Sequence, residues 1–122
     1  MFELTVRSSF AAAHRLREYD GKCENLHGHN WVVEVRVRAE SLNDIGLAID
    51  FKDLKAATDA VLDRLDHKLL NDVEPFKEMN PSSENIARWI FESLKERLGG
   101  LVVGLREVSV WENPNCCATY WE

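Results

Sequence analysis

The sequence predicts an α+β domain in which two helices cover one face of a four-stranded antiparallel sheet. Stretches near both ends alternate apolar and polar residues, which is typical of half-buried strands. Two central stretches instead repeat apolar residues at helical spacing. The chain has 122 residues, 45% of them apolar, which suits one hydrophobic core and is too short for two. We therefore expect a single domain over residues 1–122.

The strands are expected at both ends of the chain. A first strand is predicted over Phe2–Phe10 and a second over Trp31–Glu40, where the alternation is strictest. A long loop rich in turn-forming residues joins them. The tail Leu101–Trp121 returns to a β pattern, broken by a turn at Asn113–Asn115. Since consecutive strands tend to pair, each end is expected to form an antiparallel hairpin.

The helices are expected between these hairpins. Asp50 can cap a helix that runs from Phe51 to about Leu70. Ser82 or Ser83 can cap a second helix, which stops at Gly99-Gly100. The predicted order is strand, strand, helix, helix, strand, strand.

Charge and cysteine content narrow the class of protein. Fifteen basic against 21 acidic residues give a net charge of −6, which argues against a nucleic-acid-binding module. No apolar run reaches membrane-spanning length, and the N-terminus has a strand pattern rather than that of a signal peptide. Three cysteines without a Cys-x-x-Cys motif fit a reducing compartment. We expect a soluble cytoplasmic protein with a small-molecule or protein partner, in which Cys116 and Cys117 are packing residues.

Three histidines suggest a metal site. His27 and His29 flank Gly28, and residues two apart in an extended segment point to the same face. His14, just after the first strand, can supply a third imidazole and leave one coordination position open, as in catalytic zinc sites. Imidazole ligands favour Zn²⁺ without excluding Fe, Ni or Cu. Ordinary surface or hydrogen-bonded histidines are the alternative.

Further residues suit acid–base work or substrate binding. Cys23 lies four residues before His27, and a thiol beside a metal can be held as a reactive thiolate. Asp66 can orient the neighbouring His67 and raise its basicity, although a histidine near a helix end is also favoured by the helix dipole. Glu112 is expected at the end of a strand, where it can accept hydrogen bonds from an amino-heterocycle or simply face solvent.

Five segments occur in an order that resembles the 6-pyruvoyltetrahydropterin synthase family over almost the entire chain. They are FAAAHRL at 10–16, CENLHGHNW at 23–31, LDHKLLN at 65–71, NPSSENIA at 80–87 and VWENP at 110–114. The likeness is greatest to the bacterial 6-carboxy-5,6,7,8-tetrahydropterin synthase branch of queuosine (7-deazaguanine) biosynthesis, because only three residues separate Cys23 from His27. The resemblance implies the tunnelling fold, in which sheets of several subunits close into a barrel.

The resemblance also implies roles for individual residues. It implies that the zinc ligands are His14, His27 and His29. It implies that Cys23 is the catalytic thiol, that Asp66 and His67 are the acid–base pair, and that Glu112 anchors the pterin. It further implies a pterin-side segment made of Ser82, Ser83 and Glu84. Glu24, directly after Cys23, is an alternative base, because variant members of the family use a glutamate in this region.

The implied activity is that of a zinc-dependent lyase. It converts 7,8-dihydroneopterin triphosphate to 6-carboxy-5,6,7,8-tetrahydropterin and releases acetaldehyde and triphosphate. The alternatives are the 6-pyruvoyltetrahydropterin synthase reaction on the same substrate and a non-catalytic, zinc-stabilised binding domain.

A homo-oligomer is expected, because the predicted sheet leaves unpaired edge strands. The resemblance makes it a hexamer of two stacked trimers, with Asp66, His67 and Glu112 on a different subunit from Cys23 and the zinc.

Overall fold

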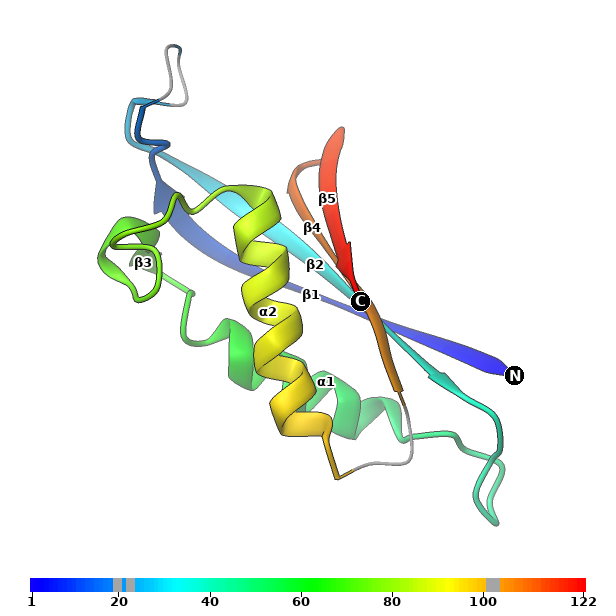
Figure 1. The fold of residues 1–122 in the computed structure, drawn as a ribbon. Helices are drawn as coiled ribbons and strands as arrows, with labels where there is room; N and C mark the ends of the chain where they lie inside the picture. The colour runs from blue at the N-terminus through cyan, green and yellow to red at the C-terminus, as the bar shows by residue number, and fades with distance from the viewer. Residues whose placement is uncertain (19–20, 22–23, 101–103) are drawn as a thin grey trace.

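A five-stranded sheet carries two helices on one face (Figure 1). The computed structural model describes residues 1–18, 21, 24–100 and 104–122. In chain order the elements are β1 (Phe2–His14), β2 (His27–Ala39), α1 (Phe51–Leu62), β3 (Lys68–Leu69), the short 3₁₀ helix η2 (Leu70–Asp72), α2 (Ser83–Leu98), β4 (Gly104–Asn113) and β5 (Cys116–Trp121). The strands lie in the order β3-β1-β2-β4-β5. The predicted α+β class and both antiparallel hairpins are confirmed.

The core lies between the helices and one face of the sheet. Alternate residues of β2 on this face are fully buried: Trp31, Val33, Val35 and Val37. Opposite them are buried apolar residues of both helices, including Leu54 and Val61 of α1 and Ile90 of α2. The intervening β2 residues Glu34 and Arg36 are only partly buried. The strict alternation in β2 therefore separates a helix-covered face from one without helices.

Both helices begin where the sequence predicts. The Asp50 side chain accepts a hydrogen bond from the Lys52 amide at 2.9 Å, and the Ser82 hydroxyl accepts one from the Asn85 amide at 3.2 Å. Each bond satisfies an amide that the first turn of a helix leaves unpaired. In the described part of the chain, no helix has the length and apolar character needed to cross a membrane.

The predicted end of the first helix, at about Leu70, is wrong. The helix α1 ends at Leu62, and after a turn the chain pairs with β1 in parallel as the unpredicted strand β3. Leu65 and Leu70 are nevertheless fully buried. Leu69, which continues the predicted helical spacing from Leu65, is half-buried, although the backbone between these two residues is no longer helical.

The first hairpin is longer than predicted. The strand β1 extends to His14 and β2 begins at His27, and these two residues are direct cross-strand partners. Residues Ala11–Ala13 hide the extension, because three successive alanines show no alternation of polarity. The longer ladder brings the histidines at the two strand ends together.

The structure corrects one expectation in the C-terminal hairpin. Cys116 and Cys117 are exposed, so they are not core packing residues. They open β5, an outer strand of the sheet, directly after the turn that follows β4. The part of the predicted strand at residues 101–103 lies outside the described residues, and β4 is described from Gly104.

Candidate functional site

Four side chains converge at one end of the sheet. His14 ends β1, His27 and His29 begin β2, and Glu112 lies near the end of β4. One ligand atom from each side chain lies within 4.8 Å of the corresponding atoms of the others. His14 and His27 share a face because they are cross-strand partners, and His29 follows two residues later on that face. These four residues, the metal cluster, form a group that can hold a metal ion.

Backbone carbonyls orient two of the imidazoles. His14 Nδ1 lies 2.7 Å from the carbonyl oxygen of Pro81, and His27 Nδ1 lies 2.7 Å from that of Asn25. A carbonyl can only accept, so each Nδ1 carries the hydrogen and each neutral ring presents a lone pair at Nε2. These two Nε2 atoms are 3.0 Å apart. Two lone pairs at that distance repel each other, and a cation bound to both removes the repulsion.

The remaining donors complete a set that fits a divalent cation. Glu112 Oε1 lies 3.2 Å from Nε2 of His14 and 3.2 Å from Nε2 of His29. Among the described residues, His29 Nε2 is the buried side-chain polar atom that has no hydrogen-bond partner. Three imidazole nitrogens and a carboxylate oxygen are the donor types found in zinc sites. The cluster therefore suits zinc in the chemistry of its donors.

Burial favours the metal-binding form of two imidazoles, those of His14 and His29. Burial lowers the pKa of His14, and repulsion from His27 and His29 adds to this effect, while the Pro81 carbonyl and Glu112 oppose it. Burial likewise lowers the pKa of His29 against the attraction of Glu112. A lowered pKa favours the neutral ring near neutral pH, and metal binding requires a neutral imidazole.

Glu112 reaches the cluster through strand pairing. The strand β4 runs antiparallel to β2 with Trp111 opposite Val32, so the next residue of β4 arrives beside His29. The expectation that Glu112 lies on a different subunit from the metal is therefore wrong, because one chain supplies all four side chains. Sequence reasoning missed this neighbourhood because it depends on the pairing of strands far apart in the chain.

Asp66 and His67 form the predicted pair away from the cluster. Asp66 Oδ2 lies 2.9 Å from His67 Nδ1, and Asp66 Oδ1 accepts a hydrogen bond from the Ala11 amide at 2.9 Å. The Ala11 amide, followed by His67, lowers the pKa of Asp66 and so favours the carboxylate. The His67 amide donates to the Ala11 carbonyl at 2.6 Å, and φ at His67 is 58°. The pair is thus fixed against β1 with a defined ring orientation.

The His67 side chain is 82% exposed. It borders an open hollow of about 500 Å³ that is also lined by residues of β1, β2 and β3. Among the described residues, no hydrogen bond or ion pair joins Asp66 or His67 to the metal cluster. Within one chain, the acid–base pair thus makes no direct polar contact with the cluster, although His67 and His29 line the same hollow.

The segment expected to bind the pterin begins beside the cluster. Pro81, whose carbonyl contacts His14, directly precedes it. The Ser82 hydroxyl is engaged in capping α2, Ser83 is half-buried and Glu84 is exposed. Direct contact of these side chains with a ligand stays a prediction.

The candidate bases lie on the loop between β1 and β2. Cys23 falls outside the described residues. Its neighbour Glu24 is exposed, and the Glu24 amide donates to the Gly21 carbonyl at 3.2 Å. The choice between the two as the base therefore stays a prediction.

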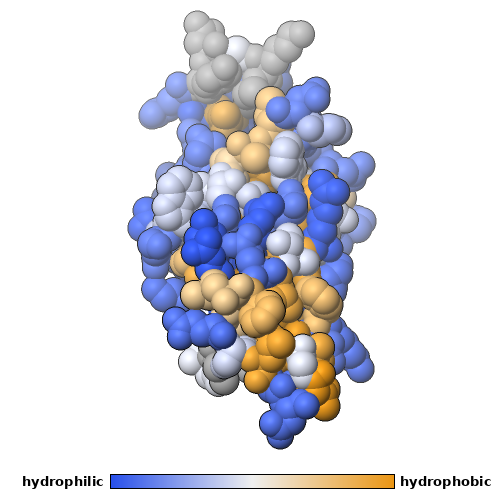
Figure 2. All heavy atoms as spheres, turned by 90° about the vertical axis from the view of Figure 1, so that its right-hand side faces the viewer, coloured by the Kyte–Doolittle hydropathy of each residue, from blue (hydrophilic) through white to orange (hydrophobic). Residues whose placement is uncertain are grey.

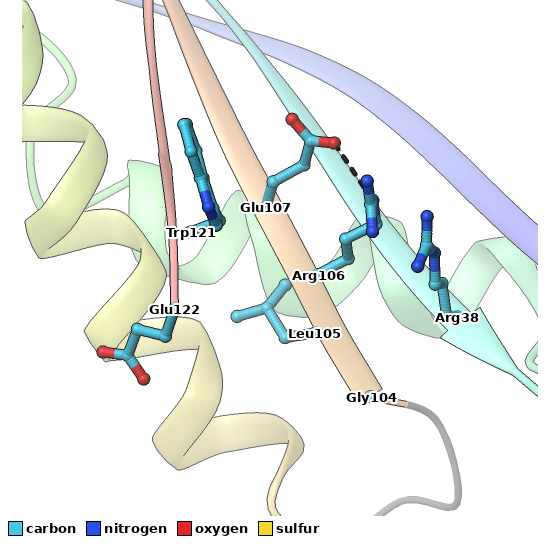
Figure 3. A pocket seen from close by; sticks show the side chains of 7 residues that line it. All are labelled: Arg38, Gly104, Leu105, Arg106, Glu107, Trp121 and Glu122. Atoms are coloured by element: carbon cyan, nitrogen blue, oxygen red, sulfur yellow. Dashed lines mark hydrogen bonds and ion pairs between the residues drawn. The ribbon is translucent and has the colours of Figure 1, made fainter.

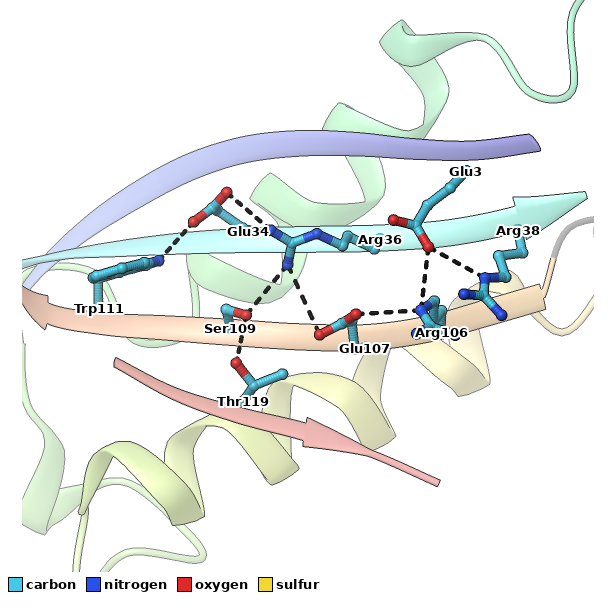
Figure 4. A network of polar contacts seen from close by, with 9 residues as sticks. All are labelled: Glu3, Glu34, Arg36, Arg38, Arg106, Glu107, Ser109, Trp111 and Thr119. Atoms are coloured by element: carbon cyan, nitrogen blue, oxygen red, sulfur yellow. Dashed lines mark hydrogen bonds and ion pairs between the residues drawn. The ribbon is translucent and has the colours of Figure 1, made fainter. Parts of the chain in front are cut away.

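A hollow of about 560 Å³ lies at the opposite end of β2 (Figure 3). Arg38 and Arg106, which line it, both contact the carboxylate of Glu3, at 3.2 and 3.1 Å. Arg106 also contacts Glu107 at 3.2 Å. These pairs belong to a polar network on the sheet face without helices (Figure 4). Because the arginines are already paired with carboxylates, this end of the sheet offers less to a charged ligand than the metal cluster does.

Comparison with known proteins identifies the family of the chain. The family model described as 6-pyruvoyl tetrahydropterin synthase matches residues 3–122. A 6-carboxy-5,6,7,8-tetrahydropterin synthase of Synechocystis is 40% identical over 118 residues, covering 93% of this chain and 88% of that protein. A dihydroneopterin monophosphate aldolase of Pyrococcus furiosus is 41% identical over 109 residues, covering 89% of this chain and 88% of that protein.

Similarity to a solved structure extends over the whole fold. The structure of Caenorhabditis elegans 6-pyruvoyl tetrahydropterin synthase matches with a TM-score of 0.86 and 36% identity. The match covers 99% of this chain and 95% of that one. The chain belongs to the 6-pyruvoyl tetrahydropterin synthase family, so the resemblance seen in its motifs is confirmed.

Proposed function

We propose that this protein is a zinc-dependent lyase of queuosine biosynthesis in the cytoplasm. It converts 7,8-dihydroneopterin triphosphate to 6-carboxy-5,6,7,8-tetrahydropterin, with release of acetaldehyde and triphosphate. The observation that carries the proposal is the metal cluster, in which the Nε2 atoms of His14 and His27 face each other at 3.0 Å with Glu112 beside them. The Synechocystis relative, which bears the name of this activity, supports the choice of reaction.

His14, His27 and His29 would hold the zinc ion, which when bound supplies a Lewis acid for a side-chain hydroxyl of the substrate. Cys23, as the thiolate, takes a proton from a side-chain carbon. His67 exchanges a proton with a substrate hydroxyl through Nε2, because its Nδ1 is engaged with Asp66. Cys23 and His67 thus each carry out one of the two proton transfers.

Glu112 is proposed to anchor the pterin ring. Both of its contacts with histidines are made by Oε1. The second oxygen, Oε2, is available to accept hydrogen bonds from the guanidine-like edge of the pterin. Such an anchor fixes the distance between the substrate side chain and the metal cluster. Ser82, Ser83 and Glu84, at the start of α2, are proposed to border the same ring.

We propose that the active site is shared between subunits of a hexamer of two stacked trimers. His67 is 82% exposed, and among the described residues it forms no hydrogen bond or ion pair with the metal cluster of its own chain. Within the part of the chain that the structure describes, the outer strands β3 and β5 each pair with one strand, which leaves an edge that another subunit can pair with. A subunit joined at such an edge can bring its Asp66–His67 pair to a neighbouring cluster.

An apolar end of the molecule supports association of the chain. Exposed large apolar side chains occur in the N-terminal residues and in the loop after β2: Met1, Phe2, Leu42, Ile45 and Leu47. Figure 2 shows hydrophobic side chains gathered at one end of the face in view. Exposed apolar patches commonly mark protein–protein contacts.

Mixing two inactive variants is expected to restore activity if sites are shared. Cys23→Ala disables one half of each site and His67→Ala the other, so a mixed hexamer contains some sites with both intact halves. Activity is measured after gentle dissociation and reassociation, and subunit exchange is followed by mass spectrometry. A monomeric mass by light scattering, or no recovery of activity despite proven exchange, would contradict the proposal.

Product analysis tests the reaction itself. We expect the purified, zinc-loaded protein to convert dihydroneopterin triphosphate to the 6-carboxy product and acetaldehyde, both identified by mass spectrometry. A 6-pyruvoyl product would instead assign the activity named for the Caenorhabditis elegans relative. An aldolase product would assign the activity named for the Pyrococcus furiosus relative. A non-catalytic zinc-stabilised domain would unfold on metal removal, yet Cys23 and His67 would be dispensable to it.

A further inference from the structure

Two asparagine side chains hold the backbone immediately after His14. Asn71 Oδ1 accepts from the Arg15 amide at 2.9 Å, and Asn71 Nδ2 donates to the Arg15 carbonyl at 3.0 Å. Asn80 repeats the arrangement at Arg17, with distances of 2.8 and 3.0 Å. Each amide thus offers a donor and an acceptor side by side, as a neighbouring β-strand does. Beyond the end of β1, the two side chains therefore replace a strand partner.

The segment that contains Asn80 also contacts the metal cluster. The next residue is Pro81, whose carbonyl accepts from His14 Nδ1 at 2.7 Å. The Asn80 carbonyl accepts from Asn85 Nδ2 in the first turn of α2 at 2.9 Å. The same short segment therefore binds the backbone beyond β1 on one side, the helix on the other, and the buried ring of His14 between them.

Arg17 closes the loop between the two asparagines. Its guanidinium donates to the carbonyls of Asn71, Phe76 and Met79, at 3.4, 2.8 and 3.2 Å. The Asn71 carbonyl belongs to η2, and the other two lie on the chain between η2 and α2. The loop is thereby fixed to the backbone that leads from His14 toward Cys23.

We infer that Asn71 and Asn80 are positioning residues for the metal centre. They lock residues 15–17 to the segment that ends at Pro81, and so fix the carbonyl that sets the orientation and tautomer of His14. An amide side chain both donates and accepts in one plane, so alanine removes both bonds and aspartate keeps only the acceptor. The inference rests on the proposed zinc-binding function and assigns a part in metal binding to two residues outside the metal cluster.

Metal affinity distinguishes positioning from general stability. Asn80→Ala is expected to weaken zinc binding by about 10–100-fold, the usual effect of removing a group that orients a ligand. Asn80→Asp is expected to weaken zinc binding by less.

The matched control is Asn43→Ala, because Asn43 Oδ1 also accepts two backbone hydrogen bonds in the loop after β2. The donors are the amides of Ile45 at 3.1 Å and Leu47 at 3.0 Å. The control should lower the Tm but leave zinc affinity within about twofold of wild type.

The dissociation constant is measured by competition with a chelator of known affinity. Metal-free protein is measured in parallel by ¹⁵N NMR of the histidine rings, in which wild-type His14 should carry its hydrogen on Nδ1. Asn80→Ala should mix the two tautomers. If Asn80→Ala does not fold, Asn80→Asp and Asn71→Asp decide the question by the same two measurements.

Two outcomes would overturn the inference. In the first, the folded Asn80 and Asn71 variants have the same zinc affinity and the same His14 tautomer as the wild type. The other is an equal loss of affinity in Asn43→Ala. A wild-type protein that binds no zinc would overturn the proposed function instead, while the tautomer measurement would still decide the positioning role.

Discussion

Replacing both His27 and His29 with alanine is expected to abolish metal binding and turnover. Zinc content should fall from about one ion per chain to near zero, because two of the three imidazoles that can ligate the metal are removed. His14 and Glu112 alone leave a two-donor site. Both histidines are partly exposed at the start of β2, so the core under the sheet stays intact. Metal analysis of protein expressed with added zinc, together with thermal unfolding, measures the effect.

His67→Ala is the matched control for the double variant. It also removes an imidazole, but one that is 82% exposed and outside the metal cluster. We expect full zinc content and lost turnover, since His67 is proposed to transfer a proton. Wild-type protein without zinc after metal-replete expression, or unchanged zinc content in the double variant, would reject the metal centre.

Cys23→Ala is expected to lower turnover by about 10²–10⁴-fold, the usual contribution of a positioned acid or base. Zinc content and fold should remain, because the three histidines of the metal cluster suffice to hold the metal. The measurement is the initial rate with dihydroneopterin triphosphate at matched zinc occupancy. The variant thus separates proton transfer from metal binding.

Glu24→Gln is the companion variant for this test. It keeps the shape of the side chain while removing its charge, and it is expected to retain turnover. If Cys23→Ala keeps near-normal turnover and Glu24→Gln loses it, the base is Glu24. If both variants remain active, neither residue is the base, and the proposed proton transfer is wrong.

Features that depend on neighbouring residues can be predicted from the sequence alone. The alternation along β2 predicts which face of that strand is buried, since successive side chains of a strand point to opposite faces. Asp50 and Ser82 predict the starts of the helices because a cap contacts an amide within the next three residues. His27 and His29 share a face for the same local reason, so a metal-binding pair is visible before any tertiary contact is known.

The distant groups that complete the site become visible only in the folded chain. Glu112 joins the histidines through the register between β2 and β4, and the Pro81 carbonyl reaches His14 across 67 positions of the chain. The end of α1 likewise depends on a segment far away in the sequence, because β3 pairs with β1. Apolar spacing reports that a side chain is buried, but strand register and loop closure are set by contacts between segments far apart, and no local pattern encodes them.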